Sequence, residues 1–366
     1  MYNLPQKLKN FTPYEPLTGE YPIRLDVNES YFELPTEEVV RAVMSMGGSS
    51  SGAPVKLNRY PDPYASRTVN AFASLFNVDP RLVVAGNGSD ELIGLIAAGL
   101  LEKGNKVLTL TPDFSMYGFY ARVYELDVIE FPKDDDFGVN VDELIDYINI
   151  NNIDCLIFSN PCNPTSLGIE KPEVMRLVKE TKALIVVDEA YMDFWAETQS
   201  MLAEATHFDN LIVLRTCSKS VALAGIRLGF AVACEKLIVA LKTVKSPFNV
   251  NSVTQAIGAA ILSDGVGYKK AIAHIKENTH SLYQALQGLR MLHVFEKIYD
   301  TKTNFVFAKT DKAEKIYEFL LERGIAVRCF APNHLRICAG TREEMNALCQ
   351  ELAKWQIQEF EGEIYD

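Results

Sequence analysis

Short runs of consecutive apolar residues alternate with amphipathic stretches from residue 82 to residue 234. Such a run is typical of a strand buried on both faces, and helical spacing of apolar residues is typical of a helix packed on one side. Strands alternating with helices predict a mostly parallel sheet covered by helices on both faces. The predicted strands are 82–85, 106–111, 155–159, 183–187, 211–214 and 230–234, and helices between them include 91–101 and 173–180.

The pattern changes toward the two ends of the chain. A long helical stretch ends near residue 289, and short strands then alternate with two helices. This later pattern predicts a smaller α+β domain, which the N-terminal segment is expected to join. We therefore predict a large domain over 45–265 and a small domain formed by 1–44 and 266–366. The corresponding predicted strands are 23–27, 304–308, 325–329 and 334–338, and the helices are 36–46, 312–322 and 342–358.

Composition narrows the class of protein. With 366 residues, 48% of them hydrophobic, the chain can bury a large core. Its net charge of −12 argues against nucleic-acid binding, which needs clustered lysine and arginine. The chain shows neither a bilayer-spanning apolar run nor a signal peptide, so we expect a cytoplasmic protein without a membrane partner. The seven cysteines form no C-x-x-C pair and the five histidines have no metal-ligand spacing, so we expect reduced thiols and no metal site.

Lys219 is the strongest candidate for chemistry. It follows the apolar run 211–214, with Thr216 and Ser218 just before it and Arg227 shortly after it. Burial lowers the pKa of a lysine and makes its amine available as a nucleophile, while hydroxyls and an arginine suit a phosphate. Pyridoxal phosphate needs both, because it has an aldehyde that reacts with lysine and a phosphate to be anchored. A lysine in an ordinary loop is the alternative interpretation.

Polar side chains also follow several of the other predicted strands. In a mostly parallel sheet, ligands collect beyond the carboxyl ends of the strands, so these side chains are expected to meet there. The residues concerned are Ser89 and Asp90, Asn163, Asp188 and Tyr191.

Two of these positions lie in short motifs. Asp188 ends an otherwise apolar strand and could pair with a protonated pyridine nitrogen, or act as a metal-binding acid or a helix cap. The chain has no G-x-x-x-x-G-K-[ST] motif, which argues against a nucleotide site of that type. The turn at 86–91 precedes a helix whose positive end favours a phosphate, although such glycine turns are commonly structural.

Three further groups are candidates for binding. Asn163 lies in a rigid turn between two prolines, which is either purely structural or holds the amide for a fixed hydrogen bond. Phe114 follows a strand end and either stacks on a flat ring or plugs the core. Arg328 and Arg336 lie on adjacent short strands, where they either recognise a carboxylate or phosphate or are simply exposed.

These motifs, in this order, resemble fold-type I pyridoxal-phosphate enzymes, and among them the histidinol-phosphate aminotransferase family. The matching stretches are Asn-Pro-x-Asn-Pro-Thr at 160–165, Val-Asp-Glu-Ala-Tyr at 187–191, Arg-Thr-x-Ser-Lys at 215–219 and Gly-x-Arg-x-Gly at 225–229. The resemblance extends from 12–14 to 340–344, which is nearly the whole chain. It implies a large domain with a mostly parallel sheet of seven strands, a small α+β domain, and aminotransferase activity that depends on pyridoxal 5′-phosphate.

The resemblance also implies roles for single residues. Lys219 would bind the cofactor aldehyde covalently and later move the proton of the reaction. Asp188 would hold the pyridine nitrogen protonated. Asn163 and Tyr191 would hydrogen-bond the 3′ oxygen, and Phe114 would stack on the ring.

The remaining implied roles concern the phosphate and the substrates. Ser218, Arg227 and the backbone around Ser89 and Asp90 would hold the phosphate, with Tyr60 reaching in from the partner subunit of a homodimer. In the substrate site, Arg336 would meet the acidic group, and Arg328 and Tyr14 would assist at the phosphate of histidinol phosphate, as would Asn163.

The resemblance implies transfer of an amino group between L-histidinol phosphate and 2-oxoglutarate, a step of histidine biosynthesis. The sequence departs from the family pattern at Ser166-Leu167-Gly168 and at Ser30, which we expect to alter the substrate entrance. Three alternatives therefore stay open: an aromatic or broad-specificity aminotransferase, a threonine-phosphate decarboxylase, and a non-catalytic module that binds pyridoxal phosphate.

Overall fold

The large part of the molecule is built on a seven-stranded sheet. In this computed structural model, residues 2–3, 5, 7, 11, 17–33, 36–45 and 55–365 are described. The strand order is β2-β8-β7-β6-β5-β3-β4, and β8 alone among these strands runs antiparallel to its neighbours. The prediction of a mostly parallel sheet is confirmed. The strands are β2 (Val83–Gly86), β3 (Lys106–Thr111), β4 (Asp127–Pro132), β5 (Cys155–Ser159), β6 (Leu184–Asp188), β7 (Leu211–Thr216) and β8 (Gly229–Val232).

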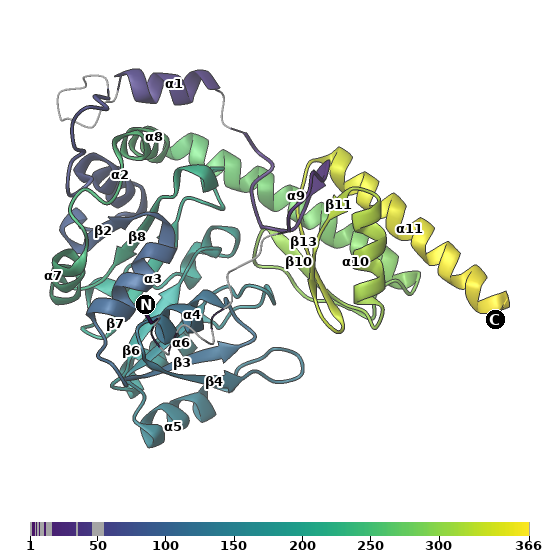
Figure 1. Cartoon of the computed structure of the whole chain (residues 1–366), viewed down its shortest axis with the longest axis horizontal. Coiled ribbons are helices and arrows are strands. Elements are labelled where there is room, and N and C mark those ends of the chain that lie inside the picture. Colours follow the sequence, from purple (N-terminus) through teal and green to yellow (C-terminus); the bar gives the residue numbers. More distant parts are fainter. Residues whose placement is uncertain are drawn as a thin grey trace.

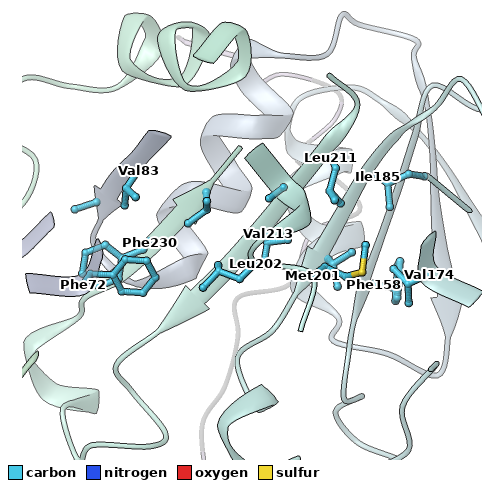
Figure 2. Packing of buried hydrophobic residues seen from close by; sticks show 14 of the residues in the cluster. Phe72, Val83, Phe158, Val174, Ile185, Met201, Leu202, Leu211, Val213 and Phe230 are labelled. Atoms are coloured by element: carbon cyan, nitrogen blue, oxygen red, sulfur yellow. The ribbon is translucent and has the colours of Figure 1, made fainter. Parts of the chain in front are cut away.

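Helices cover both faces of this sheet (Figure 1). Successive strand residues point to opposite faces, so Val186 packs into one core cluster while Ile185 and Val187 pack into the other. Figure 2 shows Phe72 against Phe230 in the second of these clusters, and their rings stack at 4.1 Å. The helices are α2 (Ser66–Phe76), α3 (Gly88–Gly99), α4 (Met116–Val123), α5 (Val141–Asn151), α6 (Lys171–Glu180), α7 (Glu235–Val244) and α8 (Ser252–Ser263).

A smaller α+β part has its own core. Its four-stranded antiparallel sheet has the order β12-β13-β10-β9, and a parallel pair, β1-β11, ties the N-terminal segment to it. The strands are β1 (Ile23–Arg24), β9 (Lys297–Ile298), β10 (Phe305–Lys309), β11 (Ile325–Ala326), β12 (Arg328–Phe330) and β13 (His334–Cys338), and the helices are α9 (Gly265–Met291), α10 (Ala313–Glu322) and α11 (Arg342–Tyr365).

Helix α1 (Thr36–Ser45) lies on the other side of the molecule from this small sheet (Figure 1). Ala42 packs into the core of the large sheet, and the helix contacts α8. Within the segment 1–44, therefore, β1 pairs with the small part whereas α1 packs on the large one. The domain limits at 45 and 265 stay a prediction. No helix in the described part of the chain is long and apolar enough to span a membrane.

Candidate active site

A cavity of about 450 Å³ lies where the carboxyl ends of the large-sheet strands face the small domain. Strands β5, β6 and β7 end at this cavity, and β12 and β13 of the small sheet contribute to its other side. Most of the residues singled out from the sequence line it. They are Ser89, Asp90, Phe114, Asn163, Asp188, Tyr191, Ser218, Lys219, Arg227, Arg328 and Arg336.

Lys219 enters the cavity from the loop that follows β7. Its Nζ donates to the carbonyl oxygen of Val27 at 3.2 Å. Burial lowers the pKa of this amine to about 8, so a larger share of it is neutral at physiological pH than for an exposed lysine. A neutral amine is the form that attacks an aldehyde, so the position suits covalent attachment of pyridoxal phosphate.

Asp188 lies at the end of β6 and is only 3% exposed. Its Oδ2 accepts a hydrogen bond from the Tyr117 hydroxyl at 2.9 Å, and its Oδ1 accepts one from the Ala190 N–H at 3.1 Å. Burial raises its pKa to about 7, and these two hydrogen bonds oppose the rise. A cation placed against the carboxylate would lower the pKa, so the site suits a protonated ring nitrogen.

Tyr117 is a site residue that our sequence prediction did not include. It is 2% exposed, lines the cavity and lies on α4, one turn beyond the Phe114 that we had predicted to stack. The two rings meet edge to face at 5.5 Å. Its spacing from Phe114 was the only available signal, because the contact with Asp188 joins residues 71 positions apart.

Arg336 and Asn163 meet inside the cavity. The Arg336 guanidinium donates from Nη1 to Asn163 Oδ1 and from Nη2 to the carbonyl oxygen of Asp26. Its Nε is buried and has no hydrogen-bond partner among the described residues. A buried guanidinium with a donor to spare suits a carboxylate ligand. Arg328 pairs in register with Arg336 across β12 and β13, so both arginines face one region.

The opposite end of the cavity collects phosphate-binding groups. Helix α3 begins at Gly88 with no side-chain cap, so the first N–H groups of the helix are available to an anion. The hydroxyl of Ser218 accepts from Thr216 Oγ1 at 3.0 Å, and Arg227 pairs with the Asp90 carboxylate at 3.1 Å. These donors suit a phosphate, so the cavity fits both ends of pyridoxal phosphate.

Glycines keep this end of the cavity compact. Gly88 has φ +77°, and a Cβ there would lie 2.8 Å from Arg227 Nη2. A Cβ on Gly229 would lie 2.6 Å from the backbone of Gly88 and Ser89. The start of α3 can therefore approach β8 and Arg227 only because both positions are glycine.

Two predicted residues are not in the cavity. Tyr60 is 82% exposed and stacks on Phe248, with the ring centroids 4.7 Å apart. Its role across a subunit boundary stays a prediction. Tyr14 lies outside the described residues.

The departures from the family pattern do not alter the cavity wall as we expected. Neither Ser30 nor any of the residues 166–168 lines the cavity. Ser166 is fully buried, and its hydroxyl lies 2.8 Å from Thr303 Oγ1 and 3.0 Å from Thr301 Oγ1. This loop therefore joins the two parts of the molecule instead of shaping the entrance, because its polar side chain is satisfied by the small domain.

The chain matches known proteins along nearly its whole length. The family model described as "Aminotransferase class I and II" matches residues 21–352. The chain is 38% identical to histidinol-phosphate aminotransferase of Clostridium novyi, covering 92% of each chain, and 36% identical to that of Clostridium kluyveri, covering 95% of this chain and 97% of the relative.

A solved structure has the same fold. The histidinol-phosphate aminotransferase of Sinorhizobium meliloti in complex with pyridoxal-5'-phosphate superposes with a TM-score of 0.83 at 21% identity, covering 98% of both chains. The predicted fold-type I architecture is confirmed. Together with the matched family model and the relatives of similar length, these likenesses establish that the chain belongs to the class I and II aminotransferases and is an enzyme that depends on pyridoxal phosphate.

Proposed function

We propose that this aminotransferase transfers the amino group of L-histidinol phosphate to 2-oxoglutarate, as a step of histidine biosynthesis. The observation that carries the proposal is the pair Arg328 and Arg336, which face the cavity from adjacent strands. Two arginines suit substrates with carboxylate or phosphate groups, which both proposed substrates have. The names of the relatives from the two Clostridium species support the same donor.

When bound, pyridoxal phosphate supplies an aldehyde that reacts with amines and a ring that withdraws electrons from the carbon losing its proton. Lys219 is the residue that holds the aldehyde end. Released by the incoming amino donor, its Nζ is the base that takes the proton from the α-carbon of the donor and returns a proton to the cofactor. The lowered pKa of Lys219 favours this role, because a base must be neutral to accept a proton.

Asp188 keeps the ring nitrogen protonated by charge pairing, and Tyr117 orients its carboxylate. Tyr191 and Asn163 donate hydrogen bonds to the 3′ oxygen, and Phe114 covers the ring. Arg336 already touches Asn163, so binding of the substrate acid at Arg336 is connected to this end of the ring.

The phosphate is held by Ser218, Arg227 and the N–H groups of Ser89 and Asp90. Asp90 contributes its backbone and not its side chain, since a carboxylate repels phosphate and here pairs with Arg227.

We further infer a homodimer in which Tyr60 completes the partner's phosphate site. Tyr60 lies in an exposed region with other large apolar side chains, namely Val40, Met44, Leu57 and Tyr64. Exposed apolar side chains in such number favour a covered surface. We infer a cytoplasmic location, supported by seven free cysteines, because unpaired thiols persist in reducing compartments.

The test is a half-reaction followed by visible absorbance. Purified protein loaded with pyridoxal phosphate is mixed with L-histidinol phosphate without an oxo acid. The band of the lysine-bound cofactor is expected to disappear and to return when 2-oxoglutarate is added. Phenylalanine and phosphothreonine serve as competing donors, and carbon dioxide release is measured for the latter. A faster response to either competitor than to L-histidinol phosphate contradicts the proposed substrate.

Lys219→Ala is expected to abolish both the band and turnover. Lys182→Ala, which removes an exposed lysine, is the matched control and is expected to retain both. Turnover by Lys219→Ala at the wild-type rate would overturn the assignment of the nucleophile.

A further inference from the structure

Asn28 links the Tyr191 hydroxyl to a buried thiol that none of the roles above uses. Asn28 Nδ2 donates to the Tyr191 hydroxyl oxygen at 2.8 Å. On its other side, the Cys338 thiol donates to Asn28 Oδ1 at 2.9 Å, and the Asn28 backbone N–H donates to Cys338 Sγ at 3.0 Å. The three residues are 2% (Asn28), 4% (Tyr191) and 2% (Cys338) exposed, so water does not compete for these bonds.

We propose that Asn28 and Cys338 are positioning residues that make Tyr191 a hydrogen-bond donor to the 3′ oxygen of the cofactor. The inference rests on the proposed placement of Tyr191 at that oxygen. It adds a chain of two residues behind Tyr191, one from the N-terminal segment and one from β13 of the small domain.

The direction of each hydrogen bond follows from the chemistry of the groups. A tyrosine hydroxyl has one proton to donate and lone pairs to accept with. The amide N–H of Asn28 can only donate, so it occupies a lone pair and leaves the Tyr191 proton for another acceptor. The Tyr191 hydroxyl has no acceptor among the described residues, and Tyr191 lines the cavity. The proton is therefore free for an oxygen of the bound cofactor.

Cys338 determines which way the Asn28 amide faces. A primary amide can rotate by half a turn and exchange its donor for its acceptor. Burial raises the pKa of the Cys338 thiol to about 11, so the thiol is protonated and donates to Oδ1. That contact directs Nδ2 toward Tyr191.

The backbone holds Asn28 in this place. Its φ is 55°, in the left-handed region that asparagine tolerates better than most residues. Its carbonyl oxygen accepts from Asn304 Nδ2 at 3.3 Å. The contacts with Cys338 and Asn304 join positions 310 and 276 residues from Asn28, so they form only when the N-terminal segment is packed on the small domain.

A measurable consequence follows for the nitrogen that joins Lys219 to the cofactor. A hydrogen bond donated to the 3′ oxygen stabilises negative charge there, and that charge grows when the neighbouring nitrogen loses its proton. Weakening the bond therefore raises the pKa of that nitrogen. The visible band of the bound cofactor reports this pKa directly, without turnover.

The experiment is a pH titration of the visible band in the holoenzyme and its variants. Cys338→Ala removes the thiol donor, and Asn28→Gly removes the amide while tolerating the positive φ. Both are expected to raise the apparent pKa by about half a pH unit, the equivalent of one ordinary hydrogen bond. Tyr191→Phe is expected to raise it at least as much. Asn28→Gly added to Tyr191→Phe is expected to cause no further shift, because both act through one hydroxyl.

Two variants serve as controls. Cys338→Ser keeps a donor in the same place and is expected to titrate like the wild type. Cys349→Ala removes a thiol from the same small domain, on α11, and is expected to leave the titration unchanged. The charged groups that face Tyr191, Arg336 and Asp188, are unaltered in all these variants. Those that face Lys219, Glu29 and Arg227, are unaltered too.

The outcomes separate this inference from the proposed site. A shift in Tyr191→Phe with none in Asn28→Gly or Cys338→Ala overturns the inference and leaves the placement of Tyr191 intact. An unchanged titration in Tyr191→Phe overturns both. Asn28→Gly decides the result if Cys338→Ala does not fold.

Discussion

At the scale of single residues, Tyr117 and Asp188 show how a buried pair tunes a charge. The Tyr117 hydroxyl donates to the Asp188 carboxylate at 2.9 Å and lowers a pKa that burial raises. Tyr117→Phe removes this stabilisation of the ionised form, so the pKa of Asp188 rises. Protonated Asp188 cannot pair with a protonated ring nitrogen, and activity is therefore lost at a higher pH on the acid side. We expect kcat/KM at neutral pH to fall about 10-fold.

The measurement is the pH profile of kcat/KM. The acid limb is expected to move to higher pH in Tyr117→Phe, and the difference from wild type is expected to shrink as pH rises. Tyr147→Phe, on α5 and packed against Phe131, is the matched control and is expected to retain the wild-type profile. A uniform loss of activity at every pH would contradict the role assigned to Tyr117.

The residues that sequence motifs predicted and those that they missed differ in a simple way. Lys219, Asp188 and Asn163 end or follow strands, so the predicted sheet alone placed them at one edge. Asn28 and Cys338 lie in segments with no distinguishing motif, and only their contacts with Tyr191 reveal them. A lone cysteine in an apolar run predicts only a core thiol.

At the scale of elements, the approach of β8 to the start of α3 decides the shape of the phosphate site. Gly229→Ala would place a Cβ 2.6 Å from the backbone of Gly88 and Ser89, so the start of the helix must move. We expect the affinity for pyridoxal phosphate to fall about 10-fold or more, since misplaced N–H groups bind phosphate poorly. Titration of the apoprotein with the cofactor measures this.

Gly288→Ala is the control for that prediction. Gly288 lies within α9, and a Cβ there meets no atom of the described residues within 4 Å. The affinity for the cofactor is expected to stay at its wild-type value. Equal losses in both variants would show that the close approach of β8 and α3 is not the cause.

A buried ionic cluster ties β7 to the turn that follows β6. Arg215 of β7, 4% exposed, donates from Nη1 to Glu189 Oε2 at 3.2 Å and from Nη2 to Asp193. Tyr268 of α9 donates to the same Asp193 at 2.7 Å. Arg215→Met would leave two carboxylates buried without their cation. We expect the free energy of unfolding to fall by about 3–5 kcal/mol, measured by urea denaturation.

Arg176→Met is the matched comparison, because Arg176 also contacts several carboxylates but lies on the surface of α6. Water screens those pairs, so a much smaller change is expected. A loss in Arg215→Met no greater than in Arg176→Met would contradict the importance of burial.

Elements were predictable where packing leaves a clear pattern. Strands β3, β5 and β13 have the predicted bounds, since each is buried along nearly its whole length. Strand β4, which we did not predict, lies at the edge of the sheet, and its residues are only partly buried. An edge strand has no continuous apolar run, so the sequence lacks the signal.

At the scale of the whole molecule, the proposed shared site predicts complementation between two inactive variants. Lys219→Ala lacks the nucleophile, and Tyr60→Ala lacks the proposed contribution to the partner's site. A mixed dimer has one site with both residues intact. Refolding an equal mixture is expected to recover about a quarter of the wild-type activity, from random pairing into dimers with one working site.

The measurement is turnover of the refolded mixture against each variant refolded alone. Tyr60→Ala alone is expected to be weakly active because its phosphate contact is missing. An activity equal to the mean of the two separate variants would contradict a shared site. A mass measurement in solution establishes in parallel whether the protein is a dimer.

The order of apolar and polar residues by itself determined the α/β class, the small second domain and the edge at which Lys219, Asp188 and Asn163 meet. These features depend on local periodicity and on the direction of parallel strands, which are properties of neighbouring residues. Only the tertiary structure decided that β8 runs antiparallel, that Tyr117 supports Asp188, and that Asn28 lies between Cys338 and Tyr191. Such contacts join residues up to 310 positions apart, and they depend on how whole elements pack, which local sequence patterns do not encode.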